Sequence, residues 1–298
     1  MLNLDQLTTE ARNPDTCSLD QMTPLEIAEV MNREDRKVID AVHEVLPEVA
    51  SAITWTREAL ENGGRLIYLG AGTSGRLGVL DSVECPPTFG VPPEMVVGLI
   101  AGGEKAFVKA VEGAEDSEDL AVEELKRIRL CKKDILIGLA ASGRTPYVIG
   151  GIKYARQLGC RTVAVACNRG SLIGREADLA IEPVAGPEVL TGSTRLKSGT
   201  AQKLVLNMIS TGAMIGIGKV YENLMVDVMQ TNEKLRVRAS NIVMEATGCD
   251  AERARALLEA TGGSAKTAIL MELAQCSAAE AAEQLKKSHG HIRDCVSK

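Results

Sequence analysis

Five short apolar runs alternate with helical patterns, and this alternation restricts the fold more than any other feature of the chain. The runs, each long enough for a β-strand, are Leu66–Leu69, Met95–Ile100, Ile135–Ala140, Thr162–Ala166 and Leu179–Ile181. Strands that are apolar at every residue are buried on both faces, as in a parallel sheet covered by helices. The pattern therefore predicts a doubly wound α/β domain around a five-stranded parallel sheet, from about residue 50 to residue 220.

Helical patterns flank this predicted domain on both sides. Thr23 and Pro24 mark a helix start, and apolar residues then recur every three or four positions to about Leu60, with a break expected at Pro47. A longer helical pattern, apolar nearly all round at Leu204–Ile217, extends from Thr194 to about Val220, and residues 232–298 contain no strand-like run. We therefore predict an N-terminal helical arm (residues 1–50), the α/β domain (51–230) and a small C-terminal helical domain (231–298).

The composition argues against several classes of protein. Aromatic residues make up only 2% and the net charge is −6, which disfavours binding to single-stranded or duplex nucleic acid. No apolar run is long enough to span a bilayer, and the first residues lack the pattern of a signal peptide, so we expect a cytoplasmic protein. The eight cysteines form no C-x-x-C pair, which predicts free thiols, and we expect no bound metal.

A glycine-rich turn follows the first apolar run. Gly70, Gly72 and Gly75 match the G-x-G-x-x-G spacing of dinucleotide-binding loops. That motif also needs an acidic residue at the end of the second strand, where this chain has Ala101-Gly102-Gly103. The turn therefore favours a different anion, because backbone N–H groups at the start of a helix bind phosphate in general.

Small hydroxyl residues recur after two strands of the predicted sheet. Ser74-Gly75-Arg76, preceded by Thr73, follows the first run, and Ser142-Gly143-Arg144-Thr145 follows the third. Parallel strands place both loops at the carboxyl edge of the sheet, where open α/β sheets bind ligands. Each loop alone is equally well explained as a turn or a helix cap. Two similar loops at one edge favour a phosphate site.

A third hydroxyl loop, Thr191–Arg195, precedes the long apolar helix. Ser193 in this loop is a further candidate ligand of the phosphate. Lys197, near the start of the helix, is either a charge partner of the phosphate or a solvated helix residue, and the sequence leaves both interpretations open.

Two glutamates are candidates for acid–base chemistry. Glu84 precedes Cys85-Pro86-Pro87, and we expect these prolines to end the helix at Glu84. The negative end of a helix dipole raises the pKa of a carboxylic acid, which suits a general acid. Glu115 lies in an acidic run that is otherwise typical of a helix start, and a solvated surface role explains either residue when it is taken alone.

Six segments together closely resemble the N-acetylmuramic acid 6-phosphate etherase family of the sugar isomerase (SIS) fold, over nearly the whole chain. They are residues 70–78, 84–90, 111–116, 140–147, 199–207 and 223–227. The resemblance implies a lyase that cleaves the lactyl ether of its phosphosugar substrate without a cofactor, in the recycling of cell-wall sugars. It implies Glu84 as proton donor and Glu115 as second catalytic residue. It also implies a homodimer with sites near the interface, and a C-terminal domain similar to the ubiquitin-associated type.

Other functions share parts of this pattern. A phosphosugar isomerase of the same fold would use the same phosphate loops and a proton transfer at C2. A phosphosugar-sensing regulatory protein would bind the ligand without turnover, although both glutamate motifs are intact. A dehydrogenase is the most distant alternative, because the ribose-binding acid is missing.

Overall fold

The computed structural model describes residues 7–109, 111–229 and 233–296. The chain divides into two compact units: residues up to Ser82 with Glu94–Ser210, and Val83–Pro93 with the residues from Thr211 onward. The chain passes between the units at three points: inside helix α3 (Gly72–Phe89), between Pro93 and Glu94, and inside helix α8 (Lys197–Gly216). The domain limits expected at residues 50 and 230 stay predictions.

The first unit contains the predicted parallel sheet. Its strands are β1 (Leu66–Gly70), β2 (Val96–Ile100), β3 (Ile135–Leu139), β4 (Arg161–Val165) and β5 (Leu179–Ile181). They pair in the order β2-β1-β3-β4-β5, and every pairing is parallel. The prediction of a doubly wound, five-stranded sheet is therefore confirmed, and each strand begins and ends within one residue of its predicted limits.

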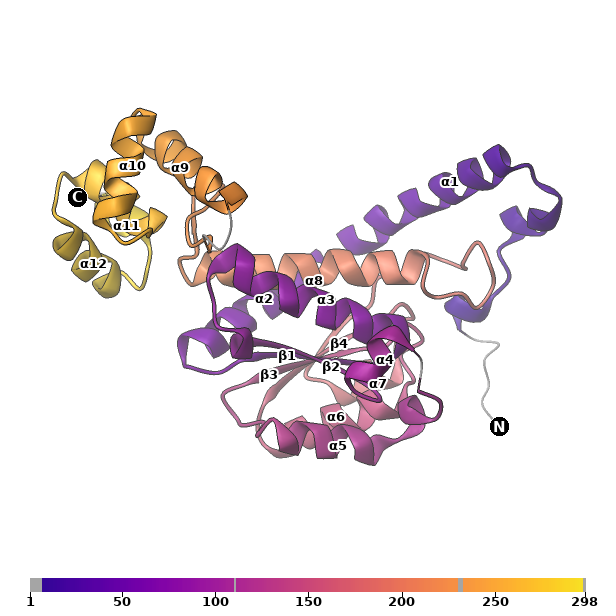
Figure 1. Ribbon diagram of the computed structural model, residues 1–298. Helices are drawn as coiled ribbons and strands as arrows, with labels where there is room; N and C mark the ends of the chain where they lie inside the picture. Colours follow the sequence, from indigo (N-terminus) through magenta and orange to yellow (C-terminus); the bar gives the residue numbers. More distant parts are fainter. Residues whose placement is uncertain (1–6, 110, 230–232, 297–298) are drawn as a thin grey trace. The chain divides into compact units, whose positions relative to one another are not determined.

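Helices cover both faces of this sheet (Figure 1). On one face, α5 (Glu118–Arg127) and α6 (Pro146–Gln157) pack on alternate strand residues such as Ile67 and Leu69. On the other face lie α2 (Leu46–Glu61) and the first part of α3, where Gly78 packs directly on Tyr68. Because both faces are covered, the strands are apolar at consecutive positions.

The N-terminal helical pattern divides as expected near Pro47. Thr23 begins α1 (Pro24–His43) with a capping box, in which Glu26 bonds back to the Thr23 N–H. The chain leaves the helix at Val45, and Pro47 lies in the first turn of α2, where its missing N–H costs no hydrogen bond.

The expected end of a helix at Glu84 is wrong. Helix α3 continues through Pro86 and Pro87 to Phe89. Two prolines remove only two helical hydrogen bonds, and the fixed φ of proline is itself helical. The helix ends instead at Gly90, which has a φ of +60° and donates its N–H to the Pro86 carbonyl. Glu84 therefore lies inside the helix, so the argument from the helix dipole does not apply to it.

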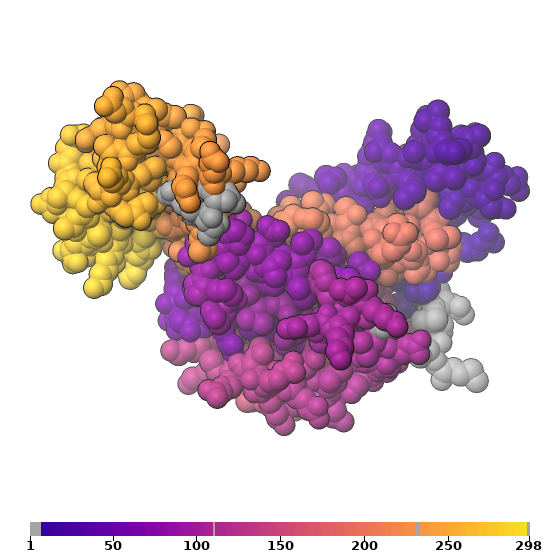
Figure 2. Space-filling model, in the orientation of Figure 1, coloured from indigo at the N-terminus to yellow at the C-terminus, as the bar shows by residue number. Residues whose placement is uncertain are grey.

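Two further helices are shorter than their patterns predict. The helical pattern of the sequence runs from Glu104 to Glu112, but helix α4 (Glu104–Val108) ends four residues earlier. This helix lies on the surface of the molecule (Figure 2). Its Val108 is 88% exposed. Helix α8 ends at Gly216, after which β6 (Val220–Tyr221) and β7 (Leu224–Met225) form a short hairpin that the sequence did not predict. Strands of two residues carry no detectable periodicity.

The second unit is otherwise helical. Its helices are α9 (Glu233–Thr247), α10 (Ala251–Ala260), α11 (Ala265–Ala274), α12 (Ala278–Lys287) and α13 (Ile292–Val296). They share a separate apolar core that includes Val243, Leu257 and Ile269. The described part of 232–298 contains no strand, as predicted.

All eight cysteines are free thiols, as expected, but only Cys85, Cys160 and Cys167 are buried. In the described ranges, no helix combines the length and the apolar character that crossing a bilayer requires.

Candidate functional site

The turn between β1 and α3 presents free amide groups at the start of a helix. In the described part of the chain, the N–H groups of Gly72, Thr73 and Ser74 have no hydrogen-bond partner. The turn is tight because a Cβ on Gly75 would lie 2.7 Å from the Gly70 carbonyl oxygen. The turn therefore places three donors and the positive end of α3 at the carboxyl edge of the sheet, an arrangement that suits an anion.

The second hydroxyl loop lies between β3 and α6. Gly143 has a φ of +72°, and a Cβ there would lie 2.3 Å from that of Ser171, so only glycine fits. Ser142 accepts a hydrogen bond from the Arg144 N–H at 3.3 Å. Thr145 occupies the cap position of α6, but its hydroxyl oxygen accepts no capping bond, so the first turn of the helix does not engage this hydroxyl and a ligand can use it.

The two loops lie next to each other. Strands β1 and β3 are neighbours, and Gly70 pairs with Leu139 at their carboxyl ends. The strand order reverses between them, since the chain proceeds from β1 outward to β2 and then back to β3 on the other side. Open α/β sheets bind their ligands at this switch point, and the two Ser-Gly-Arg segments follow the two strands that form it.

The start of α8 approaches the first loop. The Ser74 hydroxyl donates to Oε1 of Gln202 at 2.8 Å. A Cβ on Gly199 would lie 3.6 Å from Cγ2 of Thr73, an ordinary contact. Ser193, half-buried in the preceding loop, donates its N–H to the Leu190 carbonyl. Gln202 is a residue that the sequence reasoning missed, although it lies inside the quoted segment 199–207.

Glu115 lines a cavity of about 210 Å³ that begins at the same turn. The lining residues are Ala71, Gly72, Arg76, Ala101, Ala106, Val111, Glu112, Gly113 and Glu115. The Arg76 guanidinium donates to the carbonyls of Ala106 and Phe107, both at 2.8 Å, and so ties α4 to α3. The structure thus brings Glu115 beside Gly72, 43 positions earlier in the sequence.

Glu84 belongs to the second unit, whereas Glu115 and every predicted phosphate ligand belong to the first. Glu84 is exposed on α3. Its catalytic role stays a prediction that rests on the family resemblance.

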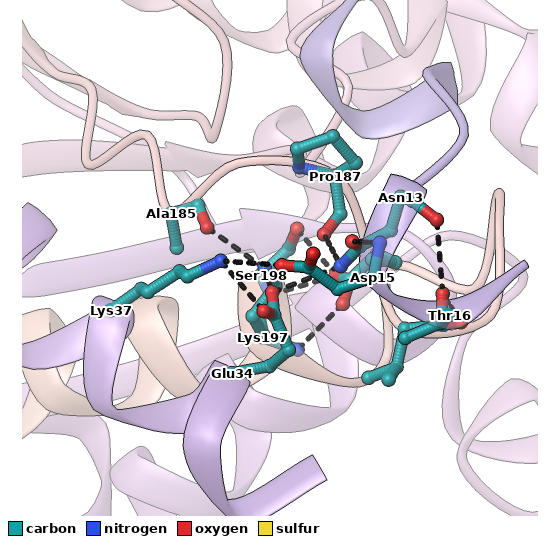
Figure 3. A network of polar contacts seen from close by, with 11 residues as sticks. Asn13, Asp15, Thr16, Glu34, Lys37, Ala185, Pro187, Lys197 and Ser198 are labelled. Atoms are coloured by element: carbon teal, nitrogen blue, oxygen red, sulfur yellow. Dashed lines mark hydrogen bonds and ion pairs between the residues drawn. The ribbon is translucent and has the colours of Figure 1, made fainter. Parts of the chain in front are cut away.

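Lys197 is neither solvated nor available to a phosphate. It is 1% exposed, and its ammonium group donates to Glu34 at 2.8 Å and to the Ala185 carbonyl at 2.9 Å (Figure 3). The partner carboxylate comes from α1, 163 residues away in the sequence. Both interpretations that the sequence left open are therefore corrected, and Lys197 fastens the N-terminal arm to the start of α8.

Glu34 is held as a carboxylate by this cluster. Burial favours the neutral acid, but hydrogen bonds from Lys197, Lys37 and Asn13 outweigh it and lower the pKa of Glu34 to about 2. Glu34 is thus ionised at neutral pH.

Asn168 is a second residue that the sequence reasoning missed. It follows β4, and its amide donates to the carbonyls of Ala141 and Ser142, each at 3.3 Å, and to the Thr9 hydroxyl at 3.0 Å. It therefore holds the second hydroxyl loop and the N-terminal arm together. A polar residue three positions after the end of a buried strand was the available signal.

A larger cavity of about 350 Å³ lies at the opposite edge of the sheet, where β3 and β4 begin. Trp55, Glu58, Lys132, Lys133 and Arg161 are among its lining residues. Arg161 already pairs with Glu58 and lies over the Trp55 ring. Since ligands of open α/β sheets bind at the carboxyl edge, the cavity beside Gly72 and Glu115 is the candidate active site.

Known proteins are similar in sequence to this chain over nearly its full length. The chain is 60% identical to the N-acetylmuramic acid 6-phosphate etherase of Pectobacterium atrosepticum, covering 99% of this chain and 97% of the relative. It is 59% identical to the enzyme of the same name from Geobacillus sp. (strain WCH70), covering 98% and 99%. The chain belongs to the N-acetylmuramic acid 6-phosphate etherase family. The predicted family is thereby confirmed.

More distant matches agree with the fold of this family. Residues 110–211 match the SIS domain family, and residues 48–156 match the N-terminal SIS domain of glucokinase regulatory protein. A phosphoheptose isomerase from Neisseria gonorrhoeae aligns with a TM-score of 0.51 at 15% identity, covering 64% of this chain and 98% of its own. At that identity the likeness shows the fold alone.

Proposed function

We propose that this protein is a carbon–oxygen lyase that converts N-acetylmuramic acid 6-phosphate into N-acetylglucosamine 6-phosphate and D-lactate. The observation that carries this proposal is the 60% identity to an etherase over essentially the whole chain. The cavity beside Gly72 and Glu115 supports a site in which a phosphate and a carboxylate act on one small substrate.

The phosphate binds at the carboxyl edge of the sheet. The donors are the free N–H groups of Gly72, Thr73 and Ser74, with the hydroxyls of Thr73, Ser142 and Thr145. Ser193 is a more distant candidate. Hydroxyl and amide donors bind a phosphate monoester without a metal. Binding energy from this unreactive group then holds the sugar in position for the reaction.

The reaction is an elimination followed by a hydration. In the open-chain aldehyde, the carbonyl at C1 acidifies the hydrogen on C2, and the Glu115 carboxylate removes that proton. The electron pair then expels the lactyl oxygen from C3, and Glu84 supplies the proton that lactate takes. Water deprotonated by Glu84 adds to C3 of the resulting enal, and C2 regains a proton from Glu115. Each acid–base step contributes roughly 10²- to 10⁴-fold in rate.

The test is the release of D-lactate from N-acetylmuramic acid 6-phosphate by the purified protein. Lactate release separates the lyase from an isomerase, which would exchange the C2 proton and leave the ether intact. It also separates the lyase from a sensor, which would bind the substrate without turnover.

Glu84→Gln tests the division of labour between the two glutamates. We expect deuterium from the solvent to enter at C2 while lactate release falls at least 100-fold, because the base remains and the acid is gone. Glu115→Gln should abolish both processes. Glu123→Gln, an exposed carboxylate on α5, is the matched control and should change neither. Loss of C2 exchange in Glu84→Gln would refute the assignment.

We further propose a homodimer and a cytoplasmic location. Eight free thiols support a reducing compartment. Sedimentation of the purified protein tests the dimer.

A further inference from the structure

The side-chain amide of Gln202, buried at the candidate phosphate site, has a hydrogen-bond partner at only one of its two polar atoms. The Ser74 hydroxyl, in the first turn of α3, donates to Oε1 of Gln202 in α8. Ser74 is 7% exposed and Gln202 is 1% exposed, so water does not compete for this bond. The other end of the same amide, Nε2 of Gln202, is buried and has no hydrogen-bond partner.

An orphaned amide donor of this kind is uncommon in a folded protein. Buried polar groups are nearly always paired, because an unmade hydrogen bond in the interior is costly. The neighbouring N–H groups of Gly72, Thr73 and Ser74 also lack partners in the described residues. The Ser74 hydroxyl is thus accompanied by two kinds of unused donor: backbone N–H groups, which an anion would use, and the Gln202 amide, which could donate to the hydroxyl itself.

The present hydrogen bond keeps Ser74 from serving that anion. A hydroxyl has one proton and two lone pairs, and the proton of Ser74 is directed at Gln202. The oxygen would therefore offer only lone pairs to a phosphate, which also carries lone pairs. Rotation of the Gln202 amide by half a turn exchanges Oε1 for Nε2. The amide then donates to Ser74, and the hydroxyl proton is free for the phosphate.

We propose that Gln202 is a positioning residue that sets the direction of the Ser74 hydroxyl, and that phosphate binding turns its amide from acceptor to donor. The inference deepens the proposed function, since it concerns the phosphate subsite of the same reaction. Gln202 does not touch the substrate in this scheme, and it acts through Ser74. The amide suits the role because it carries a donor and an acceptor at interchangeable positions.

Calorimetric binding of N-acetylglucosamine 6-phosphate to Gln202→Glu is the direct test. At pH 8 the introduced carboxylate only accepts, so it retains the Ser74 proton, and we expect affinity to fall about 10- to 100-fold. Binding of unphosphorylated N-acetylglucosamine should not change. As the pH falls and the introduced carboxyl becomes protonated, it regains a donor, and affinity for the phosphosugar should recover relative to the wild type.

Further variants separate positioning from structural support. Gln202→Met has nearly the same shape and no charge, and it should weaken phosphosugar binding less than Gln202→Glu. In a Ser74→Ala background, Gln202→Met should cost nothing further, because the residue through which it acts is gone. Gln157→Glu makes the same chemical change at the exposed end of α6 and should have no effect.

Three results would overturn the inference: equal losses for the phosphorylated and unphosphorylated sugars, full additivity of Gln202→Met with Ser74→Ala, or no loss in any Gln202 variant. If the carboxylate variant does not fold, Gln202→Met and the double variant still decide the question. The lactate assay tests the proposed lyase activity independently of the role of Gln202. A wild-type protein that binds the phosphosugar but releases no lactate would refute the lyase, whereas lactate release with unchanged Gln202 variants would refute only this inference.

Discussion

The first turns of α3 and α8 resemble each other in sequence and differ in what their amide groups contact. One contains Ser74-Gly75 and the other Ser198-Gly199. In α8, the N–H groups of Lys197 and Ser198 each donate to the Glu188 carboxylate at 2.9 Å, and the Ser198 hydroxyl does so at 2.8 Å. In α3, the first amide groups have no such partner among the described residues.

This difference explains why one helix start is structural and the other is the proposed phosphate site. Glu188 is fully buried, so α8 carries its own anion at the positive end of the helix. The start of α3 has the same electrostatic preference, but among the described residues no carboxylate accepts a hydrogen bond from its first N–H groups. A bound phosphate would accept hydrogen bonds from the first N–H groups of α3, as the Glu188 carboxylate does at the start of α8.

Among the variants that test this comparison, Lys197→Met should change stability the most. It leaves Glu34 as a buried carboxylate without its ion-pair partner, and we expect the free energy of unfolding to fall by about 3–5 kcal/mol. Urea denaturation measures the loss. Adding Glu34→Gln should restore part of it, because the stranded charge is removed.

The matched control for Lys197→Met is Lys203→Met, since Lys203 is an exposed lysine of the same helix. A surface change of this kind should alter stability by less than about 0.5 kcal/mol. The opposite outcome for Lys197→Met, unchanged stability with weaker binding of the phosphosugar, would make Lys197 a ligand after all and remove the distinction between the two helix starts.

Acid should weaken the same cluster by a smaller amount. The folded-state pKa of Glu34 is lowered to about 2, below its ordinary value near 4.5, so its contribution to stability is complete above that ordinary value. The contribution is lost as the pH falls from about 4.5 toward 2. The loss should be smaller than in Lys197→Met, because protonated Glu34 carries no stranded charge.

Urea denaturation between pH 6 and pH 3 measures this dependence. Glu34→Gln should flatten the curve, whereas Glu29→Gln, an exposed residue on the same helix, should leave it unchanged. Equal slopes for the wild type and Glu34→Gln would show that the cluster is not the acid-sensitive element.

The same contrast shows how far a sequence can predict such a site. The sheet was predictable because strand periodicity is local, and parallel strands place the Ser74 and Ser142 loops at the same edge, whereas their adjacency depends on the strand order, which the sequence did not predict. The fate of Lys197 was not predictable, since its partner Glu34 lies 163 residues away and only folding brings them together. Gln202 was not predicted for the same reason, because its role depends on a hydrogen bond with Ser74 that only folding brings about.

Alanine at the two glycines compares the two helix starts directly. In Gly75→Ala the new Cβ would lie 2.7 Å from the Gly70 carbonyl oxygen and 2.8 Å from Ile100, so backbone must move, at a cost of about 1–3 kcal/mol. In Gly199→Ala the nearest atoms are 3.6 Å away. Alanine favours a helix over glycine, so we expect Gly199→Ala to be neutral or to stabilise by up to about 1 kcal/mol.

Thermal denaturation and binding of N-acetylglucosamine 6-phosphate distinguish the two variants. Gly75→Ala should lower both stability and affinity, because the shift of the turn displaces the free amides from the phosphate. Gly199→Ala should preserve affinity, since Glu188 keeps the start of α8 in place. Equal losses of affinity in the two variants would mean that both helix starts contact the ligand. A loss of affinity in Gly75→Ala alone would locate the phosphate at α3, where the first N–H groups have no partner among the described residues.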